Sequence, residues 1–96
     1  MNVELSEEAE GQVDEIDAWW RANRLAASDL FAGELEQALA DLGALPSLGT
    51  IYEVGTQTVR RLLLYRSHYH LYFVHEPDRI YVVAVWSALR GRGPKL

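Results

Sequence analysis

Cysteine is absent from this chain of 96 residues, which excludes a disulfide framework, a thiolate nucleophile and a zinc site with cysteine ligands. Long apolar runs are also absent, and even RIYVVAVW at residues 79–86 is too short to cross a bilayer. The first residues, MNVELSEEAEG, have neither the basic nor the apolar region of a signal peptide. We therefore expect a soluble protein of the cytoplasm that has no membrane partner.

The residues that are present favour one packed domain over residues 1–96. Hydrophobic residues make up 49% of the chain, which is typical of a globular protein. The net charge of −5 is divided unevenly: residues 1–45 carry eleven acidic and two basic residues, whereas residues 46–96 carry seven basic and three acidic ones. The acidic total disfavours a general nucleic-acid binder, but the basic second half leaves room for an anionic partner on one surface.

The first half of the chain predicts a short strand and two helices. The strand covers residues 2–5, and Ser6 is a suitable N-cap for the helix that follows. A short link separates this helix from the second, which ends before Pro46, so the two should form an antiparallel hairpin. The apolar positions at helical spacing are Ala9, Val13, Ile16 and Trp20, then Phe31, Leu35, Ala38, Leu42 and Leu45.

The second half of the chain predicts a sheet. Residues 46–58 contain two glycines, a proline and no clear period, and therefore predict a loop. Three runs rich in β-branched and aromatic residues predict strands at 59–65, 68–75 and 79–86, the last of them central because it is apolar on both faces. The expected fold is α+β in the order β-α-α-β-β-β, with the helical hairpin packed on a small antiparallel sheet and a basic C-terminal tail.

Four stretches of the sequence, taken together and in their order along the chain, resemble a known protein family, although none of them would be specific alone. They are LSEEAEGQVDEIDAWW at 5–20, ALADLGALPSLG at 38–49, VRRLLLYRSHYHLYFV at 59–74 and VVAVWSALRGRGP at 82–94. Together they resemble the RelE/ParE superfamily of type II toxin–antitoxin toxins, nearer its ParE-like branch. The resemblance implies a growth-inhibiting toxin of plasmid or genome maintenance, held inactive in an oligomeric complex with a cognate antitoxin protein.

The resemblance leaves open whether the protein is an enzyme. ParE-like toxins poison DNA gyrase and need no hydrolytic residues, whereas RelE-like toxins are mRNA interferases that cut mRNA on the ribosome. Cleavage of RNA without a metal needs an activator for the 2′-hydroxyl, cations for the charged phosphorane and an acid for the leaving oxygen. RelE-like enzymes supply these groups with cations on the sheet face and a tyrosine near the C-terminus.

The match to that catalytic set is partial. Arg61 and Arg90 correspond to two of the cations, and His70 stands where such enzymes have arginine. Leu63 occupies the place of a second sheet cation, and no tyrosine follows Tyr81. Gyrase poisoning is therefore the favoured function. The alternatives are a ribosome-dependent mRNA endonuclease with these two arginines and His70 as catalytic residues, and a toxin-fold interaction module without activity.

The stretch YRSHYHLYFV places two histidines where they can share one face of a strand. His68 and His70 lack the third ligand that a zinc site needs, because His75 has the opposite parity; no metal or other cofactor is expected. His70 is a candidate acid or base, since imidazole titrates near neutral pH. In the alternative interpretation, the residues of this stretch have a packing role and no catalytic one. Its polar tips are then His68, His70 and Tyr72 on the less buried face, while Tyr69, Leu71 and Phe73 lie under the helices.

Four arginines are candidates for binding the target: Arg60, Arg61, Arg90 and Arg92. The first two are adjacent in a predicted strand and so project to opposite faces of the sheet, with one at the open face. The other two stand among glycines, which can present guanidinium groups without steric hindrance. The alternative for these two is a solvated tail without a binding role.

Overall fold

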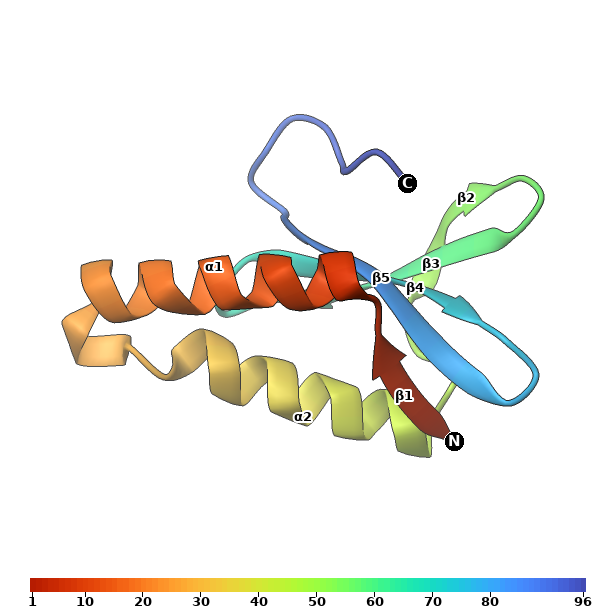
Figure 1. The fold of residues 1–96 in the computed structure, drawn as a ribbon, viewed down its shortest axis with the longest axis horizontal. Coiled ribbons are helices and arrows are strands. Elements are labelled where there is room, and N and C mark those ends of the chain that lie inside the picture. Colours follow the sequence, from red (N-terminus) through yellow and green to blue (C-terminus); the bar gives the residue numbers. More distant parts are fainter.

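A helical hairpin lies against one face of a five-stranded sheet in the structure, a computed structural model that describes residues 1–96 (Figure 1). The helices are α1 (Glu7–Asn23) and α2 (Leu30–Ala44), joined by a 3-10 helix, η1 (Leu25–Ala27). The strands are β1 (Asn2–Leu5), β2 (Thr50–Val54), β3 (Thr58–Leu64), β4 (Tyr69–His75) and β5 (Arg79–Ser87). The predicted α+β class and helical hairpin are confirmed. Neither helix combines the length and the apolarity that crossing a membrane requires.

The sheet has the order β1-β5-β4-β3-β2, with β1 parallel to β5 and every other neighbouring pair antiparallel. The central position predicted for the third strand is confirmed, because β5 lies between β1 and β4. The prediction of a small antiparallel sheet is wrong in two respects, since the sheet is mixed and has one additional strand. The direction of β1 could not be found from its sequence, because alternation with a period of two is the same in both directions.

The additional strand is β2, which falls in the segment predicted as a loop. It pairs with β3 at the edge of the sheet, with an irregularity in the ladder around Tyr52. Ile51 and Val54 are 60% and 71% exposed, so its apolar residues do not mark a buried face. Gly49 permits the strand to begin here: its φ is +86°, and a Cβ atom would lie 2.6 Å from the carbonyl oxygen of Arg61.

The two helices begin and end largely as their sequences predict. Ser6 caps α1, since its hydroxyl accepts a hydrogen bond of 3.0 Å from the backbone N–H of Ala9. Asp29 stands at the N-cap of α2 without a capping bond and instead pairs with Arg21 at 3.3 Å. The expectation that Leu45 continues the apolar stripe is wrong: α2 ends at Ala44, so helical spacing no longer applies and Leu45 is exposed.

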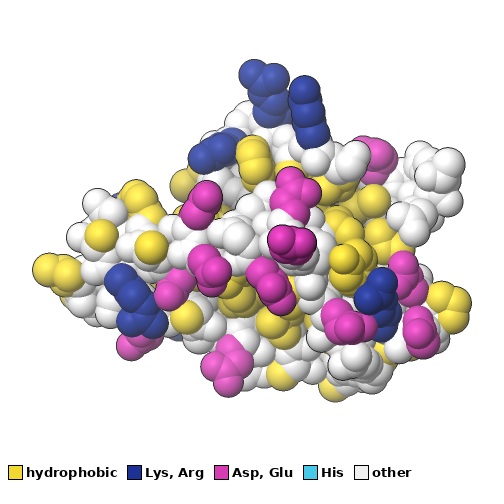
Figure 2. Space-filling view, in the orientation of Figure 1, with side chains coloured by type: hydrophobic (Ala, Val, Ile, Leu, Met, Phe, Trp, Pro, Cys, Tyr) yellow, Lys and Arg dark blue, Asp and Glu magenta, His cyan; other side chains and the backbone are white.

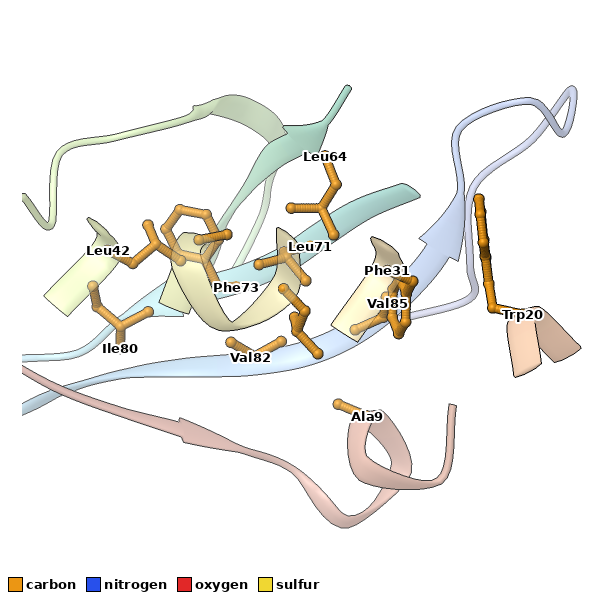
Figure 3. Close-up of a cluster of buried hydrophobic side chains, with 12 residues drawn as sticks. Ala9, Trp20, Phe31, Leu42, Leu64, Leu71, Phe73, Ile80, Val82 and Val85 are labelled. Carbon is orange, nitrogen blue, oxygen red and sulfur yellow. The ribbon is translucent and has the colours of Figure 1, made fainter. Parts of the chain in front are cut away.

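The main core fills the space between the helices and the sheet, and its strand side chains point towards the helices (Figure 3). It contains the predicted positions of both helical stripes, apart from Leu45, either buried or packed against the buried cluster. Tyr69, Leu71 and Phe73 of β4 belong to this core, as predicted. The fully buried members are Ala9, Phe31, Leu42, Leu71, Phe73, Ile80 and Val82.

A second apolar cluster lies on the other sheet face, which one interpretation of the stretch YRSHYHLYFV described as less buried and tipped with polar groups. Tyr72, a polar tip in that alternative interpretation, is only 1% exposed and packs there with Val59, Val74 and Ala84. A bulge in β5 contributes to this packing: Phe73 pairs with Val82 and Tyr72 with Ala84, so the intervening Val83 has no partner. Residues 82 and 85 consequently pack under the helices, whereas 83 and 84 join the second cluster. β5 is therefore apolar on both faces, as its sequence indicated.

Candidate functional site: a basic pocket beside the C-terminal tail

The C-terminal tail, residues 88–96, folds back towards the sheet (Figure 1). A pocket of about 390 Å³ is lined by residues of both. We call it the basic pocket. Each of the strands from β2 to β5 contributes at least one side chain, so the tertiary fold is needed to assemble it. The lining residues are Tyr52, Arg61, His70, Tyr72, Ser87, Ala88, Arg90, Gly91, Arg92 and Gly93.

The register of the ladders brings the strand residues of the basic pocket together. Arg61 of β3 pairs with Tyr72 of β4, and His70 of β4 lies between Leu63 of β3 and Trp86 of β5. Directly opposed residues and residues two apart along a strand share a sheet face. The arginine and the histidine therefore point to the same side, and this is the face away from the helices, since Tyr72 and Trp86 pack in the second cluster.

The C-terminal tail forms one wall of the pocket, because a hydrogen bond and close packing hold it against the sheet. The indole Nε1 of Trp86 donates a hydrogen bond of 3.2 Å to the carbonyl oxygen of Arg92. Gly93 lies so close to the rings below it that a Cβ atom would overlap the hydroxyl of Tyr52 and stand 3.3 Å from that of Tyr72. Glycine at this position lets the tail approach the aromatic surface, and the neighbouring arginines are thereby held at the pocket.

Aromatic rings support two of the three guanidinium groups. The Arg61 guanidinium lies 5.1 Å from the ring centre of Tyr52, and that of Arg90 lies 4.9 Å from the ring of Trp86. No acidic side chain lines the pocket. Figure 2 shows basic side chains gathered around the tail and acidic ones along α1, so the charge asymmetry of the sequence is also an asymmetry of the surface.

The surroundings of His70 favour the neutral form of its imidazole. Burial lowers the pKa of its imidazole below the usual value of 6.5, and the positive charge of Arg61 lowers it further. The His70 ring also contacts the edge of the Tyr72 ring, with 5.9 Å between their centres. A neutral imidazole can donate one hydrogen bond and accept another, so the group can bind a ligand or accept a proton.

The structure brings together three of the four arginines predicted to bind the target. Arg61, Arg90 and Arg92 line the basic pocket, whereas Arg60 projects to the other face, as strand parity requires. One Nη of Arg60 donates hydrogen bonds to two loop carbonyl oxygens, at 3.2 Å to Ser47 and 3.0 Å to Gly49. These contacts hold the entry into β2, which gives Arg60 a structural role at some distance from the pocket.

His68 lies outside the strand in which it was predicted. It has a φ of +65° and stands in the turn before β4, because β4 begins only at Tyr69. The left-handed backbone ends the alternation, so His68 is exposed and does not share a face with His70. Its backbone instead forms two hydrogen bonds of 2.8 Å. The N–H donates to the carbonyl oxygen of Leu64, and the carbonyl oxygen accepts from the N–H of Ala88. No three His, Cys, Asp or Glu side chains gather closely enough to hold a metal ion.

Sequence reasoning missed the two aromatic rings that support the arginines of this site, those of Tyr52 and Trp86. Tyr52 was missed because β2 was interpreted as a loop, and its ring gains a role only through the pairing with β3. Trp86 had a signal in the sequence, since it stands four residues before Arg90 at the end of a strand. That spacing does not predict stacking in an irregular segment, and only the fold of the tail brings the two groups together.

Comparison with known proteins gives a family and a fold. The family model described as ParE toxin of type II toxin-antitoxin system, parDE, matches residues 3–91. Among solved structures, one titled as the chromosomal ParDE TA system from P. aeruginosa is similar, with a TM-score of 0.71 at 16% sequence identity. The similarity covers 91% of this chain and 95% of that one. No curated protein sequence gives a significant match.

Proposed function

This chain belongs to the ParE toxin family of type II toxin–antitoxin systems, a branch of the RelE/ParE superfamily, and from that premise we propose that it inhibits growth by poisoning DNA gyrase. The observation that supports this proposal most is the convergence of Arg61, Arg90 and Arg92 on one pocket without any acid. Such a surface is suited to an anionic macromolecule. Gyrase with its bound DNA is a target of that kind.

A poison needs only to bind, which suits the groups of this pocket. A ligand that binds the cleaved gyrase–DNA complex more tightly than the resealed one shifts the equilibrium towards cleavage, by an amount set by its differential affinity. No acid–base pair is required of the toxin. Removing one guanidinium from such a contact is expected to weaken binding by about tenfold or more, since hydrogen bonds to charged groups contribute about 1.5–3 kcal/mol.

The test is a cleavage assay with purified gyrase and supercoiled plasmid. The wild-type protein should increase the linear DNA released by detergent and protease. Arg61→Gln and the double variant Arg90→Gln, Arg92→Gln should need at least about ten times more protein for the same effect. Arg66→Gln is the matched control, because Arg66 is exposed in the β3–β4 turn and does not line the pocket. Unchanged cleavage and unchanged supercoiling at high toxin excess would exclude gyrase as the target.

A second candidate function, mRNA cleavage on the ribosome, is favoured by one observation. Neutral His70 lies in the same pocket as Arg61 and Arg90, so a proton acceptor stands beside cations that could stabilise a charged phosphorane. If this is the activity, induction should produce codon-phased mRNA cuts in primer extension, and His70→Ala should abolish them while antitoxin binding persists. A cleavage pattern unaffected by the substitution would remove His70 from the mechanism.

We further propose a cognate ParD antitoxin as the partner that restrains the protein, since the matching family is defined by parDE. Co-expression of the neighbouring small gene should prevent growth arrest, and the two proteins should co-purify as an oligomeric complex. If the isolated chain binds this antitoxin but never slows growth, the domain is an interaction module without activity.

A further inference from the structure

The three arginines of the basic pocket have no carboxylate partners within the protein. All four ion pairs of the molecule are made by Arg21 and Arg79. Arg61, Arg90 and Arg92 line one pocket without an acid, and their like charges oppose one another there. Clustered cations that the fold leaves uncompensated are typical of sites whose counter-charge comes from a ligand.

Two of the three guanidinium groups also contact aromatic rings before any ligand arrives. Stacking on the rings of Tyr52 and Trp86 fixes one face of Arg61 and of Arg90 and leaves their N–H groups at the edge free to donate. The hydrogen bond from the Trp86 indole to the carbonyl of Arg92 fixes the tail. A site with donors fixed in this way loses little conformational entropy when it binds an anion.

The cations continue beyond this pocket along the tail. An adjoining cavity of about 460 Å³ shares Arg90 and Arg92 with the basic pocket and adds Lys95, with Glu8 as its one acid. Its wall also includes Trp86. Two neighbouring cavities with shared cations fit a ligand whose negative charges repeat along a chain better than they fit a single carboxylate.

The same sheet face offers apolar surface beside the charges. Leu63, which lies opposite His70, is 47% exposed. The rings of Tyr52 and His70 line the basic pocket, and the ring of Trp86 lines the adjoining cavity. Cationic grooves with interleaved aromatic rings are the usual surface for unpaired nucleotides, whose bases stack on the rings while the backbone contacts the cations. The acidic face along α1 repels the rest of such a chain and limits contact to a short segment.

From these observations we propose that the basic pocket binds a phosphodiester group of a nucleic acid, with a second phosphodiester in the adjoining cavity. The inference deepens the proposed function and rests on it for the source of the phosphate, which is then the DNA held by gyrase. Arg61, Arg90 and Arg92 contact the phosphate oxygens, and neutral His70 donates one hydrogen bond to them.

Direct titration of the purified full-length chain tests this inference without gyrase. Inorganic phosphate should shift the NMR signals of the His70 ring and the Trp86 indole, and a short single-stranded DNA should shift the same signals at lower concentration. For single-stranded DNA, two phosphate contacts predict a loss of affinity of about sevenfold between about 50 and 200 mM salt. Arg61→Gln and Arg92→Gln should each weaken binding by at least about tenfold, whereas Arg66→Gln should not. Arg92 is in the exposed tail, so its substitution tests the site even if Arg61→Gln fails to fold.

The titration separates this inference from the proposed function. If DNA binds but gyrase is not poisoned, the phosphodiester site stands and the gyrase target falls; tighter binding of an RNA of the same sequence would then support the mRNA candidate. If gyrase is poisoned but neither phosphate nor any oligonucleotide shifts these signals, the site is not a phosphodiester site. Binding of an acidic peptide but no oligonucleotide at the pocket would overturn the inference in favour of a protein carboxylate.

Discussion

Glu34 of α2 supplies a contact whose contribution to stability can be worked out from the structure. Its carboxylate accepts hydrogen bonds from the backbone N–H of Arg66 at 2.9 Å, the backbone N–H of Ser67 at 2.9 Å and the hydroxyl of Ser67 at 2.6 Å. These bonds fasten the helical hairpin to the turn between β3 and β4. Ser67 is the one buried polar residue of the chain, so its donors have little access to water.

Replacing this carboxylate by an amide should destabilise the protein by about 2 kcal/mol. In Glu34→Gln the charge is lost, and an NH₂ group faces one of the backbone donors, whereas hydrogen bonds to a charged group contribute about 1.5–3 kcal/mol. For a domain of this size, such a change lowers Tm by about 8–16 °C. Glu36→Gln is the matched control, since Glu36 lies two residues away on the exposed side of the same helix.

The effect of this substitution should depend on pH in a defined direction. Burial alone would raise the pKa of Glu34, but the hydrogen bonds from Ser67 and Arg66 and the charge of Arg66 outweigh it and hold the pKa below the usual 4.5. The stability that the carboxylate contributes is therefore fully present above that value and is lost as the pH falls through the folded-state pKa. Chemical denaturation of the wild type and of Glu34→Gln from pH 7 downwards should show that the difference between their unfolding free energies becomes smaller in acid. The reasoning would be refuted if this difference persisted in acid. It would also be refuted if Glu34→Gln destabilised the protein no more than Glu36→Gln does.

Three further predictions concern the core, the start of β2 and the tail. Phe31→Ala should cost about 3–5 kcal/mol in denaturant unfolding, because Phe31 is fully buried between the hairpin and the sheet; a much smaller loss would show that the core is not packed as described. Gly49→Ala should also lower the unfolding free energy, by at least about 1 kcal/mol, since its φ is positive and the added Cβ meets a backbone oxygen. Gly93→Ala should lift the tail from Tyr52 and reduce gyrase poisoning with little change in Tm, whereas Gly55→Ala, which has open space around it and does not line the basic pocket, should leave poisoning unchanged. Equal poisoning by the two glycine variants would show that the position of the tail does not matter.

Local patterns in the sequence predicted the helices and the faces of β4 correctly. Ser6 marked the start of α1, and the apolar stripes marked the buried sides of both helices, because capping and helical spacing act within one or two turns. Alternation separated Tyr69, Leu71 and Phe73 from His70 along the strand, since successive residues of a strand point to opposite faces. These features depend only on near neighbours in the chain.

The segment from residue 46 to residue 58 and the residue His68 show where local patterns fail. β2 is an edge strand with exposed apolar residues, so neither burial nor alternation distinguishes it from a loop. Its existence depends on hydrogen bonds to β3 and on the close approach of Gly49 to Arg61. His68 was placed in a strand by composition, but the turn requires a left-handed residue at that position.

The sequence by itself determined that two adjacent arginines, 60 and 61, must project to opposite faces of the sheet, and that a basic tail follows the last strand. Only the tertiary structure decided which of the two arginines shares a pocket with Arg90 and Arg92. That choice follows from which face the helical hairpin covers and from the return of the tail over Tyr52 and Tyr72. Strand parity is a property of consecutive residues, whereas partners far apart in the chain are selected by the burial of apolar surface across the whole fold.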